Sequence, residues 1–449
     1  MKKNISLILI YVLFATTDLF ASSEKKDEMS ADRFKNLELL NKVIHLVEQN
    51  YYREVNHSKL INGALKGLMS TLDPHSAFLD KNIFHKMQEE TQGEFGGLGI
   101  EVTQKDGILI VITPIEDTPA YRAGILSGDK IIEINGDSTI GLSLDEAVEK
   151  MRGDLNSIIK LGISREGAEG VQYFSLKREV IKIKPIKAAL LDQGILYIRL
   201  ISFQKNSSEY IIKEIKNSKK KLKKDKKSLN GMILDLRSNP GGLLSEAVDV
   251  SSIFLDDGVV VSTEGRDPKA KEVRYVKKLG HKELDIPLIV LINGSSASAS
   301  EIVAGALQDF NRAIIMGTTS FGKGSVQTVA KVSEDEGVKL TIAQYMTPKG
   351  RKIQALGITP DVILGNLPAD WVKKNQSRRN YIRESDLRNH LTATIESEDE
   401  KKSRLKKSVK SFFSKAEKTE SFKPMEDYQV MQAHKYIQTF KVFDRIKQN

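Results

Sequence analysis

The sequence predicts a multidomain chain of the α/β and α+β classes, and three stretches support this prediction. Ile286–Ile292 is an apolar run typical of a strand buried on both faces, a helical apolar face begins at Ser300, and Ala313–Met316 is a second short strand. A strand, turn, helix and strand in this order indicate a core of parallel strands and helices. Gly93–Arg178 contains short strands separated by turns, which indicates a small β-rich domain. Asp32–Glu90 has a helical rhythm.

The length and the charge of the chain narrow its class. Its 449 residues allow roughly two to four domains with ample core. The net charge of +10 is partly local, because residues 213–227 hold nine lysines with one glutamate and one aspartate. Residues 210–222 have a helical apolar rhythm, so we expect these lysines to solvate a helix end. No arginine or aromatic residue alternates with the lysines, which argues against nucleic-acid binding and leaves weak attraction to an anionic membrane surface.

The N-terminus predicts export. Residues 1–21 contain two lysines, an apolar run from Ile5 to Phe14 and then LeuPheAlaSer, which is typical of a secretory signal and short for a membrane-spanning helix. Leu19 is a poor residue three positions before a cleavage site, so an uncleaved inner-membrane anchor stays open. The chain has no cysteine, which excludes a disulfide and a lipoprotein anchor. We therefore expect an exported protein of a bacterial envelope, most simply of the periplasm.

The N-terminal stretch predicts two amphipathic helices. Apolar residues from Leu37 to Val47 share one helical face, residues 60–72 form another, and Asp73–Pro74 stops the second helix. His75 follows directly, and in such a turn we interpret it as a structural hydrogen-bonding residue. The chain has no His-Glu-x-x-His or paired-histidine spacing, so we expect no metal site.

The order of elements in the β-rich stretch resembles a PDZ domain. Strands are expected at 96–103, 107–112, 128–135 and, last, 158–165, and helices at 118–125 and 144–152. A PDZ domain binds a C-terminal peptide as an added strand and holds its carboxylate on backbone amides of a glycine-rich loop. The resemblance implies that Gly97, Leu98, Gly99 and Ile100 form this loop, with helix 144–152 as the opposite wall. Taken alone, the glycines also fit a simple tight turn.

Two polar turns are expected to meet at one edge of the core. Ser298 precedes the helix that begins at Ser300, where the helix dipole and free amides favour an oxyanion. Lys323 lies in the loop after strand 313–316, and both loops leave the carboxyl ends of parallel strands. The nearby chain offers no histidine, since His281 precedes the first strand. Lys323 is then the available base for Ser298, provided that burial lowers its pKa.

Two other interpretations of these turns remain open. A small-residue turn before a helix is commonly a tight turn with a serine cap. Gly317, Gly322 and Lys323 also have the spacing of a phosphate-binding P-loop, which would bind a nucleotide. However, Gly324 stands where that motif has a magnesium-binding Ser or Thr, and residues 338–345 alternate like a strand.

Several motifs, in order, resemble those of the C-terminal processing (tail-specific) serine peptidases. They are LeuAspProHisSer (72–76), GlyLeuGlyIle (97–100), LeuAspLeuArgSerAsnProGlyGly (234–242), SerAlaSerAlaSerGluIle (296–302), PheGlyLysGlySerValGln (321–327) and TyrMetThrProLysGlyArgLysIleGln (345–354). The resemblance runs from about residue 32 to residue 362, with a weaker echo at 426–436.

The resemblance implies a crotonase-like α/β core and a set of site residues. Ser298 would be the nucleophile, Lys323 the general base and Gln327 the group that orients the lysine. Arg152, in a MetArgGly segment, would belong to the family's route for sensing ligand occupancy. The resemblance also makes Asp309 noteworthy, but an acid at a helix C-terminus is electrostatically unfavourable, so we expect a structural salt bridge there.

A second strand, turn and helix can supply the oxyanion hole. Strand-like segments at 195–203 and 231–236 precede the AsnProGlyGly turn, and an apolar helix follows at 243–254. The amide of Gly241 or Gly242, together with that of Ala299, would hold the oxyanion. Glycine suits this position because it lets substrate approach closely.

These observations predict an exported serine endopeptidase that cuts unstructured protein tails recognised by its PDZ domain, without metal or ATP. The expected regions are a signal or anchor (1–21), N-terminal helices (32–92), a PDZ domain (93–178), the catalytic core (179–365) and a basic C-terminal region (366–449). Within the core, residues 341–346 and 362–364 are expected to return to the core sheet. In the C-terminal region, 375–418 is expected to be partly disordered and the final helix, 428–437, to pack back or mediate a homo-oligomer. The alternative is a PDZ scaffold that binds but does not cut.

Overall fold

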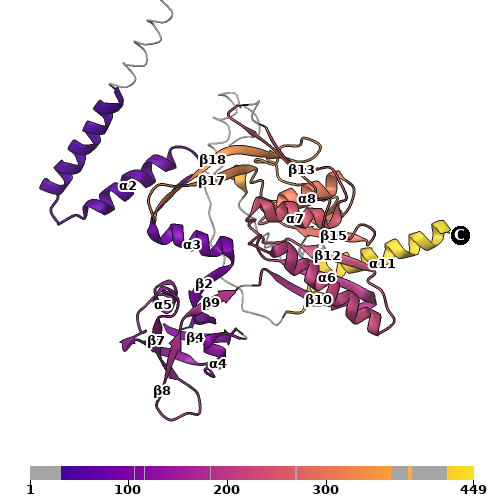
Figure 1. Cartoon of the computed structure of the whole chain (residues 1–449), viewed down its shortest axis with the longest axis horizontal. Coiled ribbons are helices and arrows are strands. Elements are labelled where there is room, and N and C mark those ends of the chain that lie inside the picture. Colours follow the sequence, from indigo (N-terminus) through magenta and orange to yellow (C-terminus); the bar gives the residue numbers. More distant parts are fainter. Residues whose placement is uncertain are drawn as a thin grey trace, which may run out of the picture. The chain divides into compact units, whose positions relative to one another are not determined.

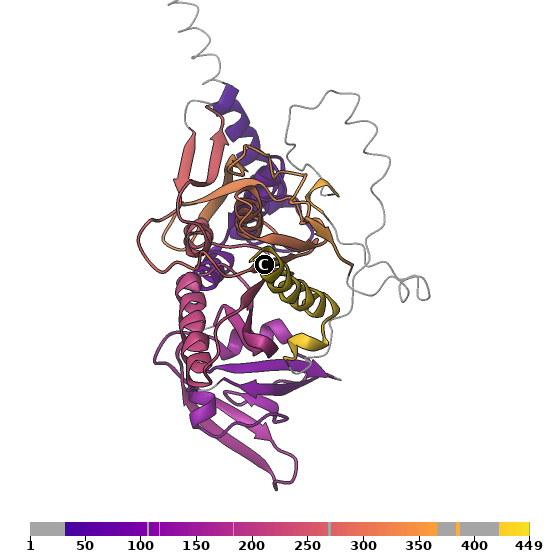
Figure 2. The ribbon, with the colours of Figure 1, turned by 90° about the vertical axis from the view of Figure 1, so that its right-hand side faces the viewer.

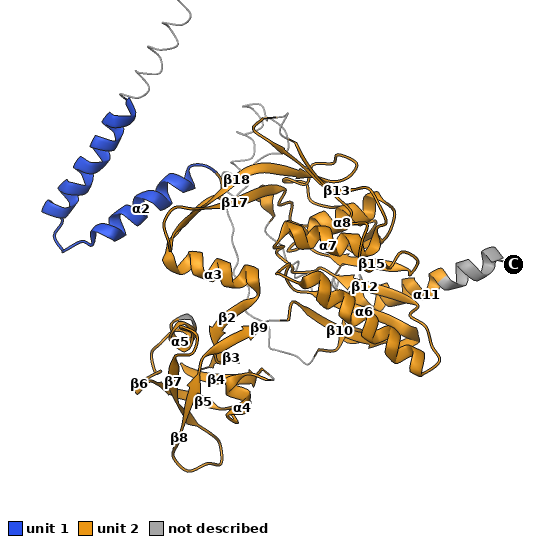
Figure 3. Ribbon diagram, in the orientation of Figure 1, with its two compact units in different colours: residues 1–72 blue, residues 73–449 orange. Residues whose placement is uncertain are grey.

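The structure is a computed structural model that forms two compact units, residues 1–72 and 73–449 (Figures 1 and 3). It describes residues 32–105, 107–115, 117–182, 184–267, 271–365, 383–386 and 422–448. The expected signal lies outside the described residues, as does the segment 375–418 apart from residues 383–386. No helix within the described ranges is long and apolar enough to cross a membrane.

The first unit consists of the two predicted helices. One spans 32–50, and α2 spans His57–Ser70 with Asn56 as its N-cap, whose side chain accepts the Lys59 amide. Ile44 is buried, whereas Leu37 and Val43 on the predicted apolar face are exposed. The helical prediction is confirmed.

The PDZ-type domain is a sheet with the order β3-β4-β5-β7-β8, and β6 pairs with β5. Its strands are β3 (Ile100–Lys105), β4 (Ile108–Pro114), β5 (Lys130–Ile134), β6 (Asp137–Ser138), β7 (Ile158–Ser164) and β8 (Val171–Lys177), and its helices are α4 (Pro119–Arg122) and α5 (Leu144–Met151). The prediction that 158–165 is the last strand is wrong, because β8 pairs antiparallel with β7 along its length. Its alternating pattern, ValGlnTyrPheSerLeuLys, is the signal that was missed.

The core sheet has six strands in the order β10-β11-β12-β15-β16-β19. They are β10 (Ile186–Leu191), β11 (Ile195–Leu200), β12 (Gly231–Asp235), β15 (Leu288–Ile292), β16 (Ile314–Gly317) and β19 (Val362–Ile363). From β11 to β19 each neighbour is parallel, and only β10 joins antiparallel. The predicted parallel unit at 286–316 is confirmed, as is the return of residues 362–364 to this sheet.

Alternate residues of the core strands pack on the two faces of the sheet. One set packs with α6 (Ser207–Lys224), α7 (Leu244–Phe254) and α8 (Ala299–Asp309). The other set packs with α11 (Tyr428–Gln448), shown in yellow in Figures 1 and 2, through Val430, Ala433 and Ile437. The final helix therefore packs back on the core, which is one of its two predicted roles.

A side-chain network holds the start of α11. Arg237, directly after β12, donates to Asp235 Oδ2 at 2.6 Å and to both carboxylate oxygens of Asp427 at 3.0 Å. Gln429 Oε1 accepts a further bond from Arg237 at 2.7 Å. The C-terminal helix is thus bonded to the segment that leads to Gly241 and Gly242.

A second sheet carries the strand that follows Lys323. Its order is β1-β18-β13-β14, and β17 pairs with β18. The strands are β1 (Ala77–Leu79), β13 (Val259–Gly265), β14 (Glu272–Tyr275), β17 (Ser325–Lys331) and β18 (Gly337–Met346). The prediction that residues 341–346 return to the core sheet is therefore wrong. They extend β18, which pairs with β17 through a hairpin.

A helix and a two-stranded ribbon connect the PDZ-type sheet to the rest of the chain. The helix α3 (Lys81–Gln92) ends at Gly93, which has a left-handed conformation (φ 70°). The ribbon pairs β2 (Glu94–Gly97) with β9 (Glu179–Lys182), so the two chain connections of the PDZ-type domain run together.

Candidate active site

Ser298 occupies a sharp turn between β15 and α8. The helix begins at Ala299, so Ser298 is its N-cap, with φ 54° and ψ −113°. A positive φ is strained for a residue with a Cβ and persists only where neighbours enforce it. Here the Ser296 hydroxyl donates to Leu236 O at 2.8 Å, and the Ala297 amide donates to Asn239 O at 3.0 Å. The serine turn is thus bonded to the turn after β12.

Gly241 lies against Ser298. A Cβ added to Gly241 would be 2.8 Å from Ser298 Cβ and 3.0 Å from the Ala299 nitrogen. A Cβ on Gly242 would collide with the carbonyl of Phe203. Both positions therefore require glycine, as expected for a close approach.

The hydrogen bonds distinguish the two candidate oxyanion glycines. The Gly241 amide already donates to Asn239 Oδ1 at 2.9 Å. The amides of Gly242 and Ala299 have no acceptor among the residues that the structure describes. This arrangement favours Gly242 over Gly241 as the partner of Ala299.

Glu301 joins the serine turn to the lysine loop, and our reasoning from the sequence missed it. Its side chain is fully buried, and it accepts four hydrogen bonds: from Ser298 N (2.8 Å), Ser320 Oγ (2.5 Å), Gly322 N (2.7 Å) and Lys323 N (2.9 Å). Burial raises the pKa of Glu301 to about 7, although its hydrogen bonds lower it. Ser298 and Glu301 have the spacing of a capping box, which is the signal that could have identified this glutamate.

Lys323 is half-buried, and its amine Nζ donates to Gln327 Oε1 at 3.1 Å. Burial lowers the pKa of Lys323, and the like charge of Lys339 lowers it further. The carboxylates of Glu384, Glu301 and Asp73 act in the opposite direction. A lowered pKa increases the neutral fraction of the amine, which a general base requires.

The structure brings the predicted trio to one region of the fold. Gln327 follows a register irregularity between Val326 and Gln327 in the β17–β18 hairpin, and it contacts the lysine amine. Among the described residues, no hydrogen bond joins Ser298 Oγ to Lys323 Nζ, and the lysine bonds to Gln327 instead. The backbones of Ser298 and Lys323 are nonetheless held on the same carboxylate oxygen.

The segment after Lys323 argues against a P-loop. A phosphate-binding loop opens a helix, whereas Ser325–Lys331 is the strand β17. Asp309 at the end of α8 makes the expected salt bridge, with Arg351, and also accepts the Lys349 amide at 2.9 Å. Asp309 therefore has a structural contact.

His75 is closer to the lysine loop than its sequence position indicates. Its Nε2 lies 2.6 Å from Glu384 Oε2, and Glu384 N donates to Phe321 O at 3.1 Å. The expectation of a hydrogen-bonding His75 is confirmed. The chain next to Ser298 and Lys323 contains no histidine, but the fold places His75 one residue, Glu384, away from the lysine loop.

The glycine-rich PDZ loop comprises fewer residues than expected. Gly97 pairs with Glu179 in the β2–β9 ribbon, and Ile100 begins β3 and pairs with Pro114, which leaves Leu98 and Gly99 for the loop. Gly99 has φ 75°, and its carbonyl accepts the Ile115 amide at 2.8 Å. The Leu98 carbonyl accepts the Ala120 amide at 3.0 Å. Both carbonyls of the loop are therefore bonded within the domain.

Arg152 follows α5 and contacts the segment before the PDZ-type sheet. It donates to Glu89 Oε2 of α3 at 2.6 Å, and its guanidinium lies 4.6 Å from the centre of the Phe95 ring. Arg152 therefore connects the end of the predicted peptide-binding helix to α3 and β2.

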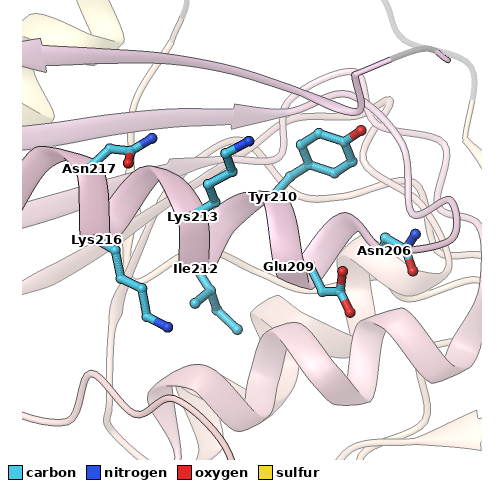
Figure 4. Close-up of a pocket in the computed structure, with 7 residues that line it drawn as sticks. All are labelled: Asn206, Glu209, Tyr210, Ile212, Lys213, Lys216 and Asn217. Carbon is cyan, nitrogen blue, oxygen red and sulfur yellow. The ribbon is translucent and has the colours of Figure 1, made fainter.

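A surface hollow runs along α6 (Figure 4). It is lined by Asn206, Glu209, Tyr210, Ile212, Lys213, Lys216 and Asn217. None of these residues belongs to the serine turn or to the lysine loop. The hollow instead belongs to the lysine-rich helix, whose lysines are exposed as predicted.

The fold and the site define a class of α/β proteins. In this class a PDZ-type domain precedes a parallel core, and Ser298 lies where the turn after β15 meets the turn after β12. A family profile described as "Peptidase family S41" matches residues 194–364. Profiles described as "PDZ domain" and "Activating protease CtpB N-terminal domain" match residues 110–165 and 11–83.

Individual relatives agree with these profiles. A carboxy-terminal-processing protease of Bartonella bacilliformis is 44% identical over 81% of this chain and 82% of its own length. The carboxy-terminal processing protease CtpA of Bacillus subtilis is 34% identical over 81% of this chain and 78% of its own. A solved photosystem II D1 C-terminal processing protease is 28% identical, with a TM-score of 0.41, over 74% of this chain and 94% of its own. The chain belongs to peptidase family S41 and is a relative of the carboxy-terminal processing proteases.

Proposed function

We propose that this protein is an exported serine endopeptidase that cuts other proteins near apolar, unstructured C-terminal tails. Ser298 is the nucleophile, Lys323 the general base and Gln327 the residue that orients the lysine. Membership of family S41 supports a peptidase. One observation carries the residue assignment: the amides of Ser298 and Lys323 share Glu301 Oε2, so the fold builds the two turns as one unit.

The proposed reaction begins when the neutral amine of Lys323 takes the proton of the Ser298 hydroxyl. The serine oxygen attacks the scissile carbonyl carbon, and the amides of Gly242 and Ala299 bind the resulting oxyanion. The C–N bond then breaks, and the ammonium group of Lys323 returns the proton to the leaving amine. Water, deprotonated by Lys323, attacks the acyl-enzyme, releases the new C-terminus and regenerates the serine.

The contact between Lys323 and Gln327 supports this order of events. A neutral amine that donates one hydrogen to Gln327 Oε1 keeps its lone pair free for the serine proton. Closure of the site requires Lys323 Nζ and Ser298 Oγ to come within hydrogen-bond distance when substrate binds, as catalytic contacts commonly do.

The test uses purified protein and a folded reporter with an apolar, unstructured tail. We expect Ser298→Ala and Lys323→Ala each to abolish cleavage while circular dichroism and the thermal transition stay unchanged. A fluorophosphonate probe should label the wild-type protein but not Ser298→Ala. Cleavage that persists in either variant would show that the assignment is wrong. A chain that binds tails but resists the probe would be the PDZ scaffold.

Tail recognition is assigned to the PDZ-type domain. Leu98, Val148 and Leu144 belong to or pack on its apolar core, beside the loop that would hold the terminal carboxylate. An apolar terminal residue therefore fits this groove better than a charged one. Amidation of the reporter's C-terminus should weaken cleavage because it removes the negative charge of the terminal carboxylate. A peptide that lacks a PDZ-binding tail should likewise be cut slowly at any concentration.

We assign the protein to the bacterial envelope, with its N-terminal segment as signal or inner-membrane anchor. Most lysines of residues 213–227 are exposed, which supports weak attraction to anionic lipid. The purified protein should float with vesicles containing anionic lipid at low salt but not with neutral vesicles. A homo-oligomer remains part of the proposal and is tested by light scattering.

A further inference from the structure

A short C-terminal segment docks beside the lysine loop. Within residues 383–386, Glu384 begins the 3₁₀ turn η2 (Glu384–Asp386), and its side chain is fully buried. Its amide donates to Phe321 O at 3.1 Å, two residues before Lys323. Arg383 Nη2 donates to Leu356 O at 2.8 Å. The segment is therefore attached to the fold by backbone and side-chain bonds.

The carboxylate of Glu384 joins parts of the chain that are far apart. His75 Nε2 lies 2.7 Å from Glu384 Oε1 and 2.6 Å from Oε2. Gln354 Nε2 donates to Oε1 at 2.9 Å, and Gln354 Oε1 accepts the amide of Gly324 at 2.9 Å. Gly324 directly follows Lys323, so a continuous chain of hydrogen bonds leads from Glu384 to the lysine loop.

His75 is itself held by the turn that contains it. Asp73 Oδ1 accepts the amides of His75 (2.8 Å) and Ser76 (2.9 Å) and the hydroxyl of Thr341 (3.1 Å). Thr341 pairs with Gln327 in the β17–β18 hairpin. The LeuAspProHisSer motif therefore contacts both Glu384 and the hairpin that carries the lysine's partner.

A fully buried carboxylate needs partners of this kind. An unpaired charge in a protein interior is strongly unfavourable, and it becomes acceptable only when hydrogen bonds and opposite charges compensate it. Glu384 has such partners on two sides, one from the N-terminal motif and one from the loop after β18. Its position beside Lys323 means that its charge acts on the lysine amine as well.

The charges around Lys323 come from several elements. Lys339 on β18 disfavours the charged amine, whereas Glu301 on α8, Asp73 before β1 and Glu384 on η2 favour it. Burial outweighs these carboxylates, because the net pKa of Lys323 is lowered. His75 faces Glu384, with Nε2 2.6 Å from Glu384 Oε2.

We propose that Glu384, a residue of the C-terminal region, is a positioning residue for Lys323 and completes the active site from that region. This inference rests on the proposed function of Lys323 as the base. The Glu384 amide holds Phe321, and its carboxylate holds Gln354 and favours the charged form of the lysine amine. No contact of Glu384 with substrate is required.

The experiment compares Glu384→Gln with Asp386→Asn in the full-length protein. Gln keeps the shape of the side chain and one acceptor oxygen, but it removes the charge and replaces the second acceptor oxygen with a donor. Asp386 lies on the same turn and is exposed, and its carboxylate accepts a hydrogen bond from the Arg383 amide. Asp386→Asn therefore controls for the loss of a nearby negative charge and for the folding of the turn. The profile of kcat/KM against pH is measured for both variants.

Because Glu384 favours the charged amine, its neutralisation should increase the neutral fraction of Lys323 at low pH. We expect the acid limb of the Glu384→Gln profile to move to lower pH by on the order of half a unit, and that of Asp386→Asn to stay in place. Glu384→Ala, which also removes the side-chain hydrogen bonds to His75 and Gln354, should lower kcat by roughly 10-fold to 100-fold with little change in KM.

A second measurement does not depend on turnover. The pH dependence of acylation of the Lys323 amine, followed by peptide mass mapping, should show the same displacement in Glu384→Gln. Superimposable curves for wild type, Glu384→Gln and Asp386→Asn would overturn the inference. The inference would also fail if the activity lost in Glu384→Ala were fully explained by a smaller fraction of folded protein. If the wild-type chain neither cuts the tail nor reacts with the serine probe, the proposed function itself fails, whatever the lysine curves show.

Discussion

Ser298 and Lys323 donate their backbone amides to the same oxygen, Glu301 Oε2, at 2.8 and 2.9 Å. The proposed nucleophile follows β15, and the proposed base follows β16, on neighbouring parallel strands. One buried side chain therefore fixes the spacing of two loops that the sequence separates. Displacement of that carboxylate would move both residues at once.

Replacement of Glu301 by alanine should inactivate the enzyme without touching either reactive side chain. The variant leaves the amides of Gly322 and Lys323 and the Ser320 hydroxyl without their acceptor. We expect the free energy of unfolding to fall by roughly 2–4 kcal/mol and kcat by about 100-fold. Urea denaturation and tail-cleavage kinetics measure the two effects. Full activity in a folded variant would contradict this role.

Glu301 also predicts a pH dependence of stability. Its pKa is raised from 4.5 to about 7 in the folded protein, so between these values the folded state holds the proton more strongly than the unfolded state. Its contribution to stability is therefore complete below about pH 4.5 and is lost as pH rises through about 7.

Glu301→Gln cannot ionise and should lack this loss. The difference in unfolding free energy, wild type minus Glu301→Gln, should fall between these pH values by on the order of 3 kcal/mol. Urea titrations at a series of pH values measure it. A flat difference would mean that Glu301 has an ordinary pKa in the folded protein.

Gly241→Ala should nearly silence cleavage. The added methyl group would press on Ser298 Cβ and on the Ala299 amide, one of the proposed oxyanion donors. Loss of one such donor raises the barrier by about 2.7–4 kcal/mol, a decrease in kcat of about 100-fold to 1,000-fold. Gly280→Ala is the matched control, since Gly280 also has a positive φ (117°) but open space around it. Equal losses in the two variants would point to backbone strain rather than to the site.

Lys339→Gln should move the activity profile in the direction opposite to Glu384→Gln. Lys339 lowers the pKa of Lys323, so its removal raises that pKa and decreases the neutral fraction of the base. The acid limb of kcat/KM should move to higher pH by a few tenths of a unit. Lys331→Gln, at the exposed end of β17, removes the same charge at a more distant position. A shift of equal size in both variants would indicate a general charge effect.

Much of the core could be predicted because its signals are local. The buried run before the SerAlaSerAlaSer turn and the helical face after Ser300 identify β15 and α8 within a few residues. The parallel order then brings Ser298 and Lys323 to one edge of the sheet. Glu301 was also within reach, because the capping-box spacing from Ser298 is a local pattern.

Other features depend on contacts that no local pattern carries. His75 and Glu384 are 309 residues apart, and nothing in either neighbourhood indicates the other. The second sheet was missed for a related reason. Residues 341–346 alternate as any strand does, and only the hairpin partner β17 and the distant β1 and β13 decide which sheet they join.

The position of α11 has a consequence for the turn that carries the proposed oxyanion glycines. Ile437 covers Gly231 at the start of β12, and Asp427 holds Arg237 at its end, just ahead of the Gly241–Gly242 turn. Removal of this helix would uncover one face of the central sheet and release Arg237 from one of its carboxylates. Damage to α11 should therefore be felt at the Gly241–Gly242 turn as well as in the sheet itself.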